Sequence, residues 1–166
     1  IKPDKHEAWN NRGTALSALG RKEEAIASYE QAVASKPDLH EAWNNRGLAL
    51  DDLGRKEEAI ASYEQAVAIK PDFHEAWYNR GVALSALGRK EEAIASYEKA
   101  IEFKPDYHKA WYNKAGCYGL QGKIDLAIET LQHAIDLDAK YREWAKTDSD
   151  FDGIRDDERF QAVIGE

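Results

Sequence analysis

Residues 40–73 read HEAWNNRGLALDDLGRKEEAIASYEQAVAIKPDF, and most of this pattern occurs again before and after it. Tryptophans mark the period, because Trp9, Trp43, Trp77 and Trp111 lie 34 residues apart. A fixed period of this length is typical of stacked arrays, in which each small unit buries its apolar face only against its neighbours. The repetition therefore predicts the architecture of most of the chain.

Each unit predicts two antiparallel helices. In residues 6–39 apolar positions recur at helical spacing, stop at Gly20 and then resume. Pro37 ends the second helix, since proline lacks an N–H and disfavours a helical residue before it. Asp38 and Glu41 have the spacing of a capping box, so we expect the next helix to begin there. The other copies of these signals are Pro71, Pro105, Asp4 with Glu7, and Asp72 with Glu75.

Small residues interrupt the helices at fixed places. Glycine inside a helix costs about 1 kcal/mol relative to alanine, so a packing reason is required for Gly13, Gly47 and Gly81. We expect these glycines to let helices approach closely, and Ala25 and its copies to form hollows for tyrosine and tryptophan rings. Enlarging the copy at Ala59 should therefore overpack the array.

The pattern resembles the tetratricopeptide repeat (TPR) family. The resemblance implies an all-α fold, an α-solenoid that coils into a right-handed superhelix, with the first helix of each unit lining the concave surface. The units would be residues 6–39, 40–73, 74–107 and 108–141. The residues that carry the match in the first unit are Trp9, Gly13, Leu16, Gly20, Ala25, Tyr29, Ala32 and Pro37. The family more often has leucine where this chain has Arg12, Arg46, Arg80 and Lys114, which should leave the fold intact.

The two ends depart from the period. Residues 1–5 match the end of an internal unit, so we expect the chain to be a fragment of a longer array. The fourth unit drifts, because Ala115 replaces the helix glycine and Ala139 replaces the final proline. Residues 142–166 break the repeat, and we expect them to form capping helices over the last apolar face.

Composition limits the partners. The formal net charge is -8, and basic residues are interleaved with acids, which argues against nucleic acid. No apolar run approaches the ~20 residues that cross a bilayer, so we expect no membrane partner. One cysteine forms no internal disulfide, which favours a reducing compartment, by default the cytoplasm.

A ladder of asparagines is the strongest binding signal. Asn11, Asn45, Asn79 and Asn113 hold one position in all four units. Their amides offer donors and an acceptor that match a peptide backbone, and by resemblance they would face the groove. Helices pack about 8–10 Å apart and a peptide advances about 3.3 Å per residue, so one asparagine would meet every third residue. The alternative is that these amides are simply solvated.

Neighbouring positions predict selectivity for a basic or aromatic peptide. The same helical stripe carries acids and, toward the end of the chain, two tyrosines. The alternative for the glutamates is that they complement the helix dipole. The candidate residues are Glu7, Glu41, Glu75, Asp51, Asp52, Asn10, Asn44, Tyr78 and Tyr112.

Metal and catalytic chemistry have little support. The recurring His6, His40, His74 and His108 should lie too far apart for one zinc ion, and we expect them to be surface residues at helix starts. Asp148, Asp150 and Asp152 imitate the first half of a calcium loop, but Arg159 stands where the bidentate glutamate belongs, which favours an acidic helix-capping loop. Cys117 fills an alanine position and has no catalytic partner. We expect no metal, no cofactor and no enzyme.

Three functions remain open on these residues. The first is a scaffold that binds an extended peptide of a partner protein in the concave groove. The second is a self-assembling module, a homo-oligomer formed through the uncapped N-terminal end. The third is a region that recruits substrate for a larger enzyme.

Overall fold

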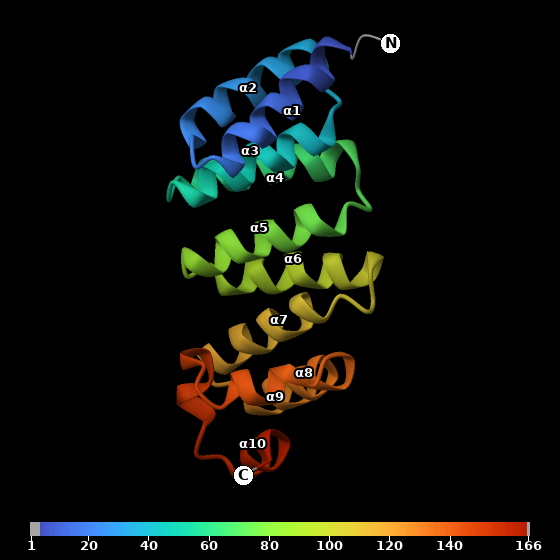
Figure 1. Ribbon diagram of the computed structural model, residues 1–166. Coiled ribbons are helices and arrows are strands. Elements are labelled where there is room, and N and C mark those ends of the chain that lie inside the picture. Colours follow the sequence, from blue (N-terminus) through green and yellow to red (C-terminus); the bar gives the residue numbers. More distant parts are fainter. Residues whose placement is uncertain (1–3, 166) are drawn as a thin grey trace.

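The structure, a computed structural model, describes residues 4–165 and consists of helices stacked in consecutive pairs (Figure 1). The first helices of the pairs are α1 (Lys5–Ala18), α3 (His40–Asp52), α5 (His74–Ala86) and α7 (His108–Leu120). The second helices are α2 (Lys22–Ser35), α4 (Lys56–Ile69), α6 (Lys90–Phe103) and α8 (Ile124–Leu137). The chain ends in α9 (Lys140–Ala145), the 3-10 helix η1 (Ser149–Ile154) and α10 (Glu158–Ile164). The predicted all-α solenoid of antiparallel helix pairs is confirmed.

The turn inside each pair depends on glycine. Gly20 has φ of 76°, a left-handed conformation that other residues rarely adopt, and the N–H of Arg21 then reaches back to the carbonyl of Leu16 at 2.9 Å. The same turn recurs in every pair, at Gly54, Gly88 and Gly122. At the other end, α2 stops at Ser35, two residues before Pro37, as predicted.

The predicted start of the first helix is confirmed, because Asp4 is the N-cap of α1, but its side chain makes no capping hydrogen bond. The predicted start of the next helix is wrong, because α3 begins at His40 with Leu39, not Asp38, at the N-cap. A turn precedes the helix, in which the N–H of Leu39 donates to the carbonyl of Lys36 at 3.2 Å, so Asp38 lies in the turn and not at the N-cap. Phe73, the copy of Leu39 in the second unit, is the N-cap of α5 and packs edge-on against His40, with ring centroids 5.0 Å apart.

His40, His74 and His108 are partly buried against aromatic rings and are not the surface residues we expected. His40 and His74 have side chains only 20% and 21% exposed. His74 packs edge-on against Tyr107, and Nδ1 of His108 lies 2.7 Å from the hydroxyl of Tyr141. Each of these three histidines contacts the aromatic residue that ends its own unit, where the chain passes to the following helix.

Close helix approach is confirmed at the mid-helix glycines. A Cβ on Gly47 would lie 2.5 Å from Cε1 of Tyr63, which comes from the second helix of the same pair. Gly13 and Gly81 meet their tyrosines in the same way. Ala59 is fully buried, as the hollow that we expected there requires.

Side chains also tie one repeat to the next. The indole N–H of Trp43 donates to the carbonyl of Pro37 at 2.9 Å, which fixes α3 to the turn before it. Arg46 donates to Ser62 of its own pair at 2.7 Å and to Glu30 of the preceding pair at 3.0 Å. The arginine thus bridges repeats from a position where the family more often has leucine.

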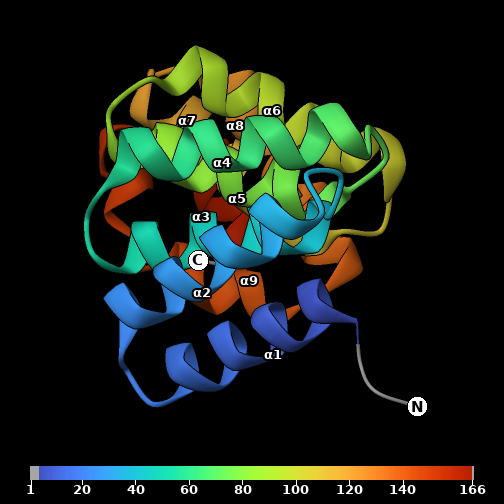
Figure 2. The same cartoon turned by 90° about the horizontal axis from the view of Figure 1, so that it is seen from above.

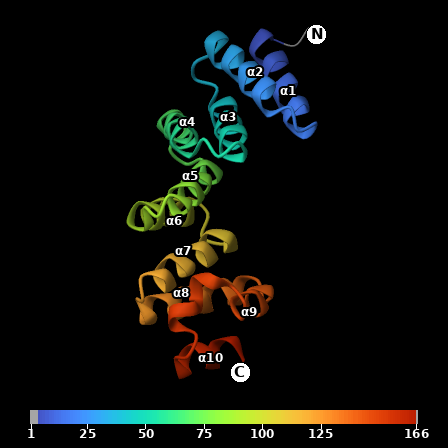
Figure 3. The same ribbon diagram turned by 90° about the vertical axis from the view of Figure 1, so that its left-hand side faces the viewer.

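The array is curved. Figure 3 shows the stack bowed, with α1, α3, α5 and α7 toward the inner side and α4, α6 and α8 toward the outer side. Seen from above in Figure 2, successive pairs are rotated relative to one another. The first helix of each pair therefore supplies the inner surface.

The C-terminal segment, here called the cap (residues 140–164), packs on the last pair. Its buried side chains join Leu131 and Ile135 of α8 in one apolar cluster. The cap residues of this cluster are Tyr141, Ala145, Phe151, Ile154, Phe160 and Ile164. The cap thus covers an apolar face that α8 would otherwise expose.

Candidate functional site

The ladder asparagines link neighbouring repeats. Nδ2 of Asn45 donates to Oδ1 of Asn10 at 3.3 Å, and Nδ2 of Asn79 donates to Oδ1 of Asn44 at 3.0 Å. Each bond joins first helices of adjacent pairs across 35 residues. One hydrogen of each amide is therefore used inside the protein, while the second hydrogen and the carbonyl oxygen remain for another partner.

Hydrogen bonds of the first helices continue in the third and fourth pairs, but tyrosine and aspartate replace asparagine as partners. Nδ2 of Asn113 donates to the hydroxyl of Tyr78 at 3.2 Å. Tyr112, one repeat further, donates its hydroxyl to Oδ2 of Asp148 in the cap at 2.7 Å. The cap thus supplies the partner that a further ladder residue would otherwise provide. The three asparagine bonds share an offset of 35 residues, a regularity that is present in the sequence but that the sequence analysis did not identify.

Exposure varies along the ladder. Asn11 is exposed, whereas Asn45, Asn79 and Asn113 are half-buried. Asn44 is buried, with only 7% of its surface exposed, because it lies beneath the amide of Asn79. Asn44 is therefore a supporting residue in this structure and offers little surface to a ligand.

The acidic candidates fall into two groups. Glu41 and Glu75 are exposed at the first turns of α3 and α5, each beside the histidine before it at 3.2 and 3.1 Å. Glu7 is exposed at the corresponding place in α1. A hollow of about 290 Å³ lies between α1 and α3, and two of these glutamates line it together with Asn10, Asn11 and Leu39.

Asp51 and Asp52 lie at the other end of α3 and are paired. Asp51 contacts Nζ of Lys56 at 2.7 Å, and Asp52 contacts Nζ of Lys22 at 2.5 Å. These lysines offset the negative charge that the sequence alone assigned to this part of the stripe. The structure does not bring the two aspartates together with Glu41.

The two candidate tyrosines differ in burial. Tyr78 is half-buried against Tyr97 and Tyr107, and burial raises the pKa of its hydroxyl. Tyr112 is 7% exposed and stacks on Tyr141 of the cap, with ring centroids 4.4 Å apart. Burial and the hydrogen bond to Asp148 raise the pKa of the Tyr112 hydroxyl, so it stays a neutral donor.

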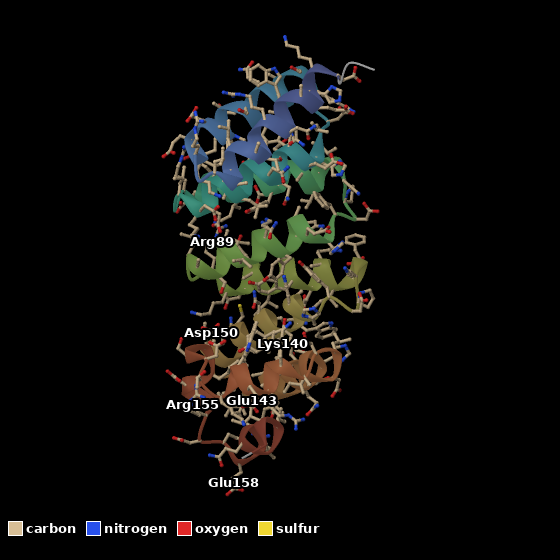
Figure 4. The ribbon with its side chains drawn as sticks, viewed as in Figure 1. Arg89, Lys140, Glu143, Asp150, Arg155 and Glu158 are labelled. Atoms are coloured by element: carbon tan, nitrogen blue, oxygen red, sulfur yellow. The ribbon has the colours of Figure 1, made fainter. Side chains whose placement is uncertain are left out.

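The cap also covers part of α7. Gly116 and Gly119 stand where a Cβ would meet Asp150, at 2.7 Å from Oδ2 and 2.6 Å from the backbone carbonyl oxygen respectively. Figure 4 shows Asp150 and Lys140 entering this end of the array from η1 and α9. The inner surface of α7 is therefore partly closed, in contrast to α1, α3 and α5.

The acidic loop is built as a set of helix caps. Asp148 accepts from the backbone N–H of Asp150 at 3.0 Å and caps η1, and Asp157 accepts from that of Arg159 at 2.9 Å and caps α10. Asp152 pairs with Arg155 at 2.7 Å. Within residues 4–165 no group of three acidic, histidine or cysteine side chains converges as a metal site would require.

Cys117 is a buried core residue, 1% exposed. Burial raises the pKa of its thiol, which disfavours the reactive thiolate, and its Sγ lies 3.6 Å from Oγ of Ser85. In the described part of the chain, no helix is both long and apolar enough to span a bilayer.

Comparison with known proteins gives consistent matches. Residues 10–72 and 45–108 match a family model described as tetratricopeptide repeat, and residues 88–147 match a second model with the same description. A comparison with curated protein sequences finds no match.

Solved structures of similar fold follow the same pattern. The crystal structure of MamA is 25% identical, with 86% of this chain and 83% of that chain covered and a TM-score of 0.79. YrrB, described as a TPR protein with an unusual peptide-binding site, is 17% identical, with 95% and 75% covered and a TM-score of 0.74. The first TPR of Spaghetti (RPAP3), bound to the HSP90 peptide SRMEEVD, is 24% identical, with 74% and 97% covered and a TM-score of 0.70. The last two similarities concern the fold alone.

Proposed function

Because this chain belongs to the tetratricopeptide repeat family, we propose that it is a non-catalytic protein-interaction scaffold that holds an extended peptide along α1, α3, α5 and α7. Proteins of similar fold are described with peptide sites or bound peptides, namely YrrB and RPAP3. The buried Cys117 thiol, whose pKa is raised, offers no nucleophile for chemistry.

The observation that carries the proposal is the fixed orientation of the ladder amides. Asn45 and Asn79 are each held by one hydrogen bond to the preceding repeat, so little side-chain entropy remains to be lost on binding. Each amide keeps one donor and one acceptor for the backbone of a peptide. Because first helices stand about 8–10 Å apart, successive amides would meet about every third peptide residue.

The exposed glutamates support a preference for basic peptides. Glu7 and Glu41 line one hollow beside Asn11, so a lysine or arginine side chain would meet carboxylates on both sides. Such exposed charges contribute to selectivity and association rate more than to affinity. A charge-reversing Glu41→Lys substitution should shift peptide selection away from basic sequences.

A backbone-directed experiment tests the ladder. A peptide selected from a random display library would be titrated by calorimetry against the wild type, Asn79→Ala and the control Gln65→Ala, which removes an exposed amide from α4. We expect Asn79→Ala to weaken binding about fivefold to tenfold and Gln65→Ala to have no effect. N-methylation of the peptide backbone at alternate residues should weaken binding similarly.

Either of two results would contradict the proposal that the ladder amides bind a peptide. One is equal affinity of the wild type and Asn79→Ala, which would take the amide out of recognition. The other is failure of the library to yield any peptide that binds in solution. Thermal melting of each variant should be recorded, because the bond to Asn44 also contributes to packing.

The face of α1 at the N-terminal end of the stack supports self-association as a second candidate. Ala8 and Ala15 are exposed, although their copies Ala42 and Ala49 in α3 are 0% and 1% exposed. Leu19 beside them is 72% exposed. A second copy of the chain would bury this apolar face.

Light scattering across protein concentration tests this candidate. If α1 mediates association, the mass should rise with concentration, and Ala15→Glu should return the chain to a monomer. The control Ala61→Glu places the same charge on an exposed site of α4 and should leave the association unchanged. A monomer at every concentration would eliminate the candidate and leave peptide binding unaffected.

A further inference from the structure

The chemistry of the inner row reverses toward the cap. Glu7, Glu41 and Glu75 occupy the first turns of α1, α3 and α5, but Lys109 occupies the same place in α7. Three residues further along each helix, the residue is asparagine in the first two repeats and tyrosine in the last two. The inner row is therefore acidic and polar at one end and basic and aromatic at the other.

A hollow of about 370 Å³ lies at the aromatic end, between α5, α7 and α9. Tyr112 and Tyr141 are stacked, and the ring of Trp144 meets them edge-on at 6.1 and 5.3 Å between centroids. Trp144 is 54% exposed, an unusual state for so large an apolar side chain. The residues that line the hollow include Tyr78, Tyr112, Tyr141, Trp144, Lys109 and Lys140.

The carboxylate of Asp148, which lines the hollow, is already engaged. Asp148 accepts from the hydroxyl of Tyr112 at 2.7 Å through one oxygen and from the N–H of Asp150 at 3.0 Å through the other. Lys140 pairs with Asp138 at 2.5 Å and lies over the ring of Trp144. A cationic ligand group would therefore find little free negative charge here.

Lys109, Trp144 and Tyr78 each bring to the hollow a donor that has no acceptor among residues 4–165. Lys109 takes part in no ion pair or hydrogen bond there, and the indole N–H of Trp144 donates to no protein group. The hydroxyl of Tyr78 accepts from Asn113 but has no acceptor for its own hydrogen. Unengaged donors beside a free ammonium group select a ligand that brings an anionic acceptor.

We propose that this hollow binds an aromatic side chain of the partner together with an adjacent aspartate or glutamate, whose carboxylate contacts Lys109. This inference rests on the proposed function and deepens it. A bound segment would then be basic toward α1 and aromatic and acidic toward the cap, which fixes its direction along the array.

The position of Lys109 assigns the carboxylate to a side chain and not to a chain terminus. Lys109 stands in the same row as Glu41 and Glu75, and equivalent positions in successive repeats meet equivalent parts of an extended peptide. If these glutamates contact basic side chains, Lys109 contacts an acidic side chain by the same geometry. The volume of the hollow accommodates one aromatic ring with its neighbouring residue.

Synthetic peptides with blocked ends test the proposal by fluorescence anisotropy. Each carries a lysine-rich block joined by a Gly-Ser spacer to Trp-Asp, Trp-Lys or Ala-Asp, and a second set has the blocks in reverse order. We expect Trp-Asp to bind about tenfold more tightly than either alternative, in one block order only. Lys109→Glu should reverse the preference between Trp-Asp and Trp-Lys.

Two further variants complete the test. Lys123→Glu makes the same charge change at an exposed site beyond the other end of α7, and it should leave the preference unchanged. Trp144→Ala should remove the advantage of Trp-Asp over Ala-Asp, and its melting curve shows whether the cap remains folded.

The outcomes separate this inference from the proposed function. Equal binding of Trp-Asp and Trp-Lys would overturn the inference, while a remaining loss of affinity in Glu41→Lys would keep the groove intact. A peptide with a free terminal tryptophan that binds as well as Trp-Asp would overturn the side-chain assignment. If neither these probes nor library peptides bind, both proposals fail.

Discussion

The second and fourth repeats solve one packing problem in two ways. In the second repeat Gly47 leaves room for the ring of Tyr63 from the same helix pair. In the fourth repeat the corresponding residues are Ala115 and Leu131, both fully buried, so a smaller partner allows a methyl group on α7. The drift in sequence is therefore a coordinated exchange and not a loss of the repeat.

The glycines of α7 stand at other positions than those of α1, α3 and α5, because α7 packs against η1 of the cap. Gly116 and Gly119 face η1 of the cap, whereas the copies Leu48 and Asp51 in α3 face no such element. The backbone of η1 comes closer to α7 than a side chain would allow. The position of small residues in equivalent helices is thus set by the element that packs against each helix.

The largest expected effect is on the core of the cap. Phe151 is fully buried against Phe160 and Tyr112, so Phe151→Ala should lower the free energy of unfolding by about 3–5 kcal/mol. The control is Phe103→Ala in the third repeat, where the ring is 39% exposed and the loss should be much smaller. Urea unfolding followed by circular dichroism measures both, and equal losses would contradict the packing described for the cap.

Exchanging the two packing solutions tests their equivalence. Gly47→Ala should destabilise the second repeat by about 1–3 kcal/mol, because the new methyl group meets the ring of Tyr63. Combining it with Tyr63→Leu copies the fourth repeat, so the double variant should lose less stability than the sum of the single variants. Strictly additive losses in a double-mutant cycle would show that Ala115 and Leu131 are not a matched pair.

Overpacking an alanine hollow should have a similar or slightly smaller effect. Ala59 is fully buried in the second repeat, and Ala59→Leu should destabilise the array by about 1–3 kcal/mol. Ala61→Leu on the exposed side of the same helix is the matched control and should be nearly neutral. An unchanged melting temperature for Ala59→Leu would contradict the tight packing of α4.

The stability of the capped end should depend on pH because of Asp150 in the cap. Burial, and next the charge of Asp148, raise the pKa of this carboxyl in the folded state above its ordinary value of 3.8. The folded state then binds more protons than the unfolded state, so the contribution of Asp150 to stability falls as pH rises from 3.8 through the raised pKa. Asp150→Asn should flatten this part of the stability curve, and parallel curves for the two proteins would refute the assignment.

The smallest expected effect concerns the bridging arginines. Arg80 donates to Ser96 at 2.6 Å and pairs with Glu64, whereas Lys114 in the fourth repeat pairs with Glu98 alone. Arg80→Lys should therefore cost no more than about 1 kcal/mol, the value of the lost hydrogen bond. Thermal unfolding measures it, and a loss as large as that of Gly47→Ala would contradict this ranking.

Features that depend on the period were predictable from the sequence, and features that depend on contacts between repeats were not. The helix pairs follow from glycine and proline signals such as Gly20 and Pro37, because those residues act locally. The start of α3 was misplaced because the chain forms a turn, closed by the bond from the N–H of Leu39 to the carbonyl of Lys36, before the helix begins. The bond from Asn45 to Asn10 joins residues that no local pattern connects.

The candidate site shows the same division. The sequence indicated the asparagine ladder and the acidic row, but it did not reveal that Asp51 and Asp52 are paired with lysines from second helices. Tyr112 looked available on α7, yet the cap covers most of it, since the fold of residues 140–164 does not follow the repeat.

The bond from Tyr112 to Asp148 has a consequence for how such a chain changes length during evolution. The fourth repeat carries the tyrosine and the displaced glycines that the cap requires, so it serves as an adaptor that cannot be exchanged for an ordinary copy. Duplication of a unit between the first and third repeats would preserve every junction. On the side of the cap, growth of the array is therefore expected only ahead of the adaptor, and we expect the adaptor and the cap to be inherited together.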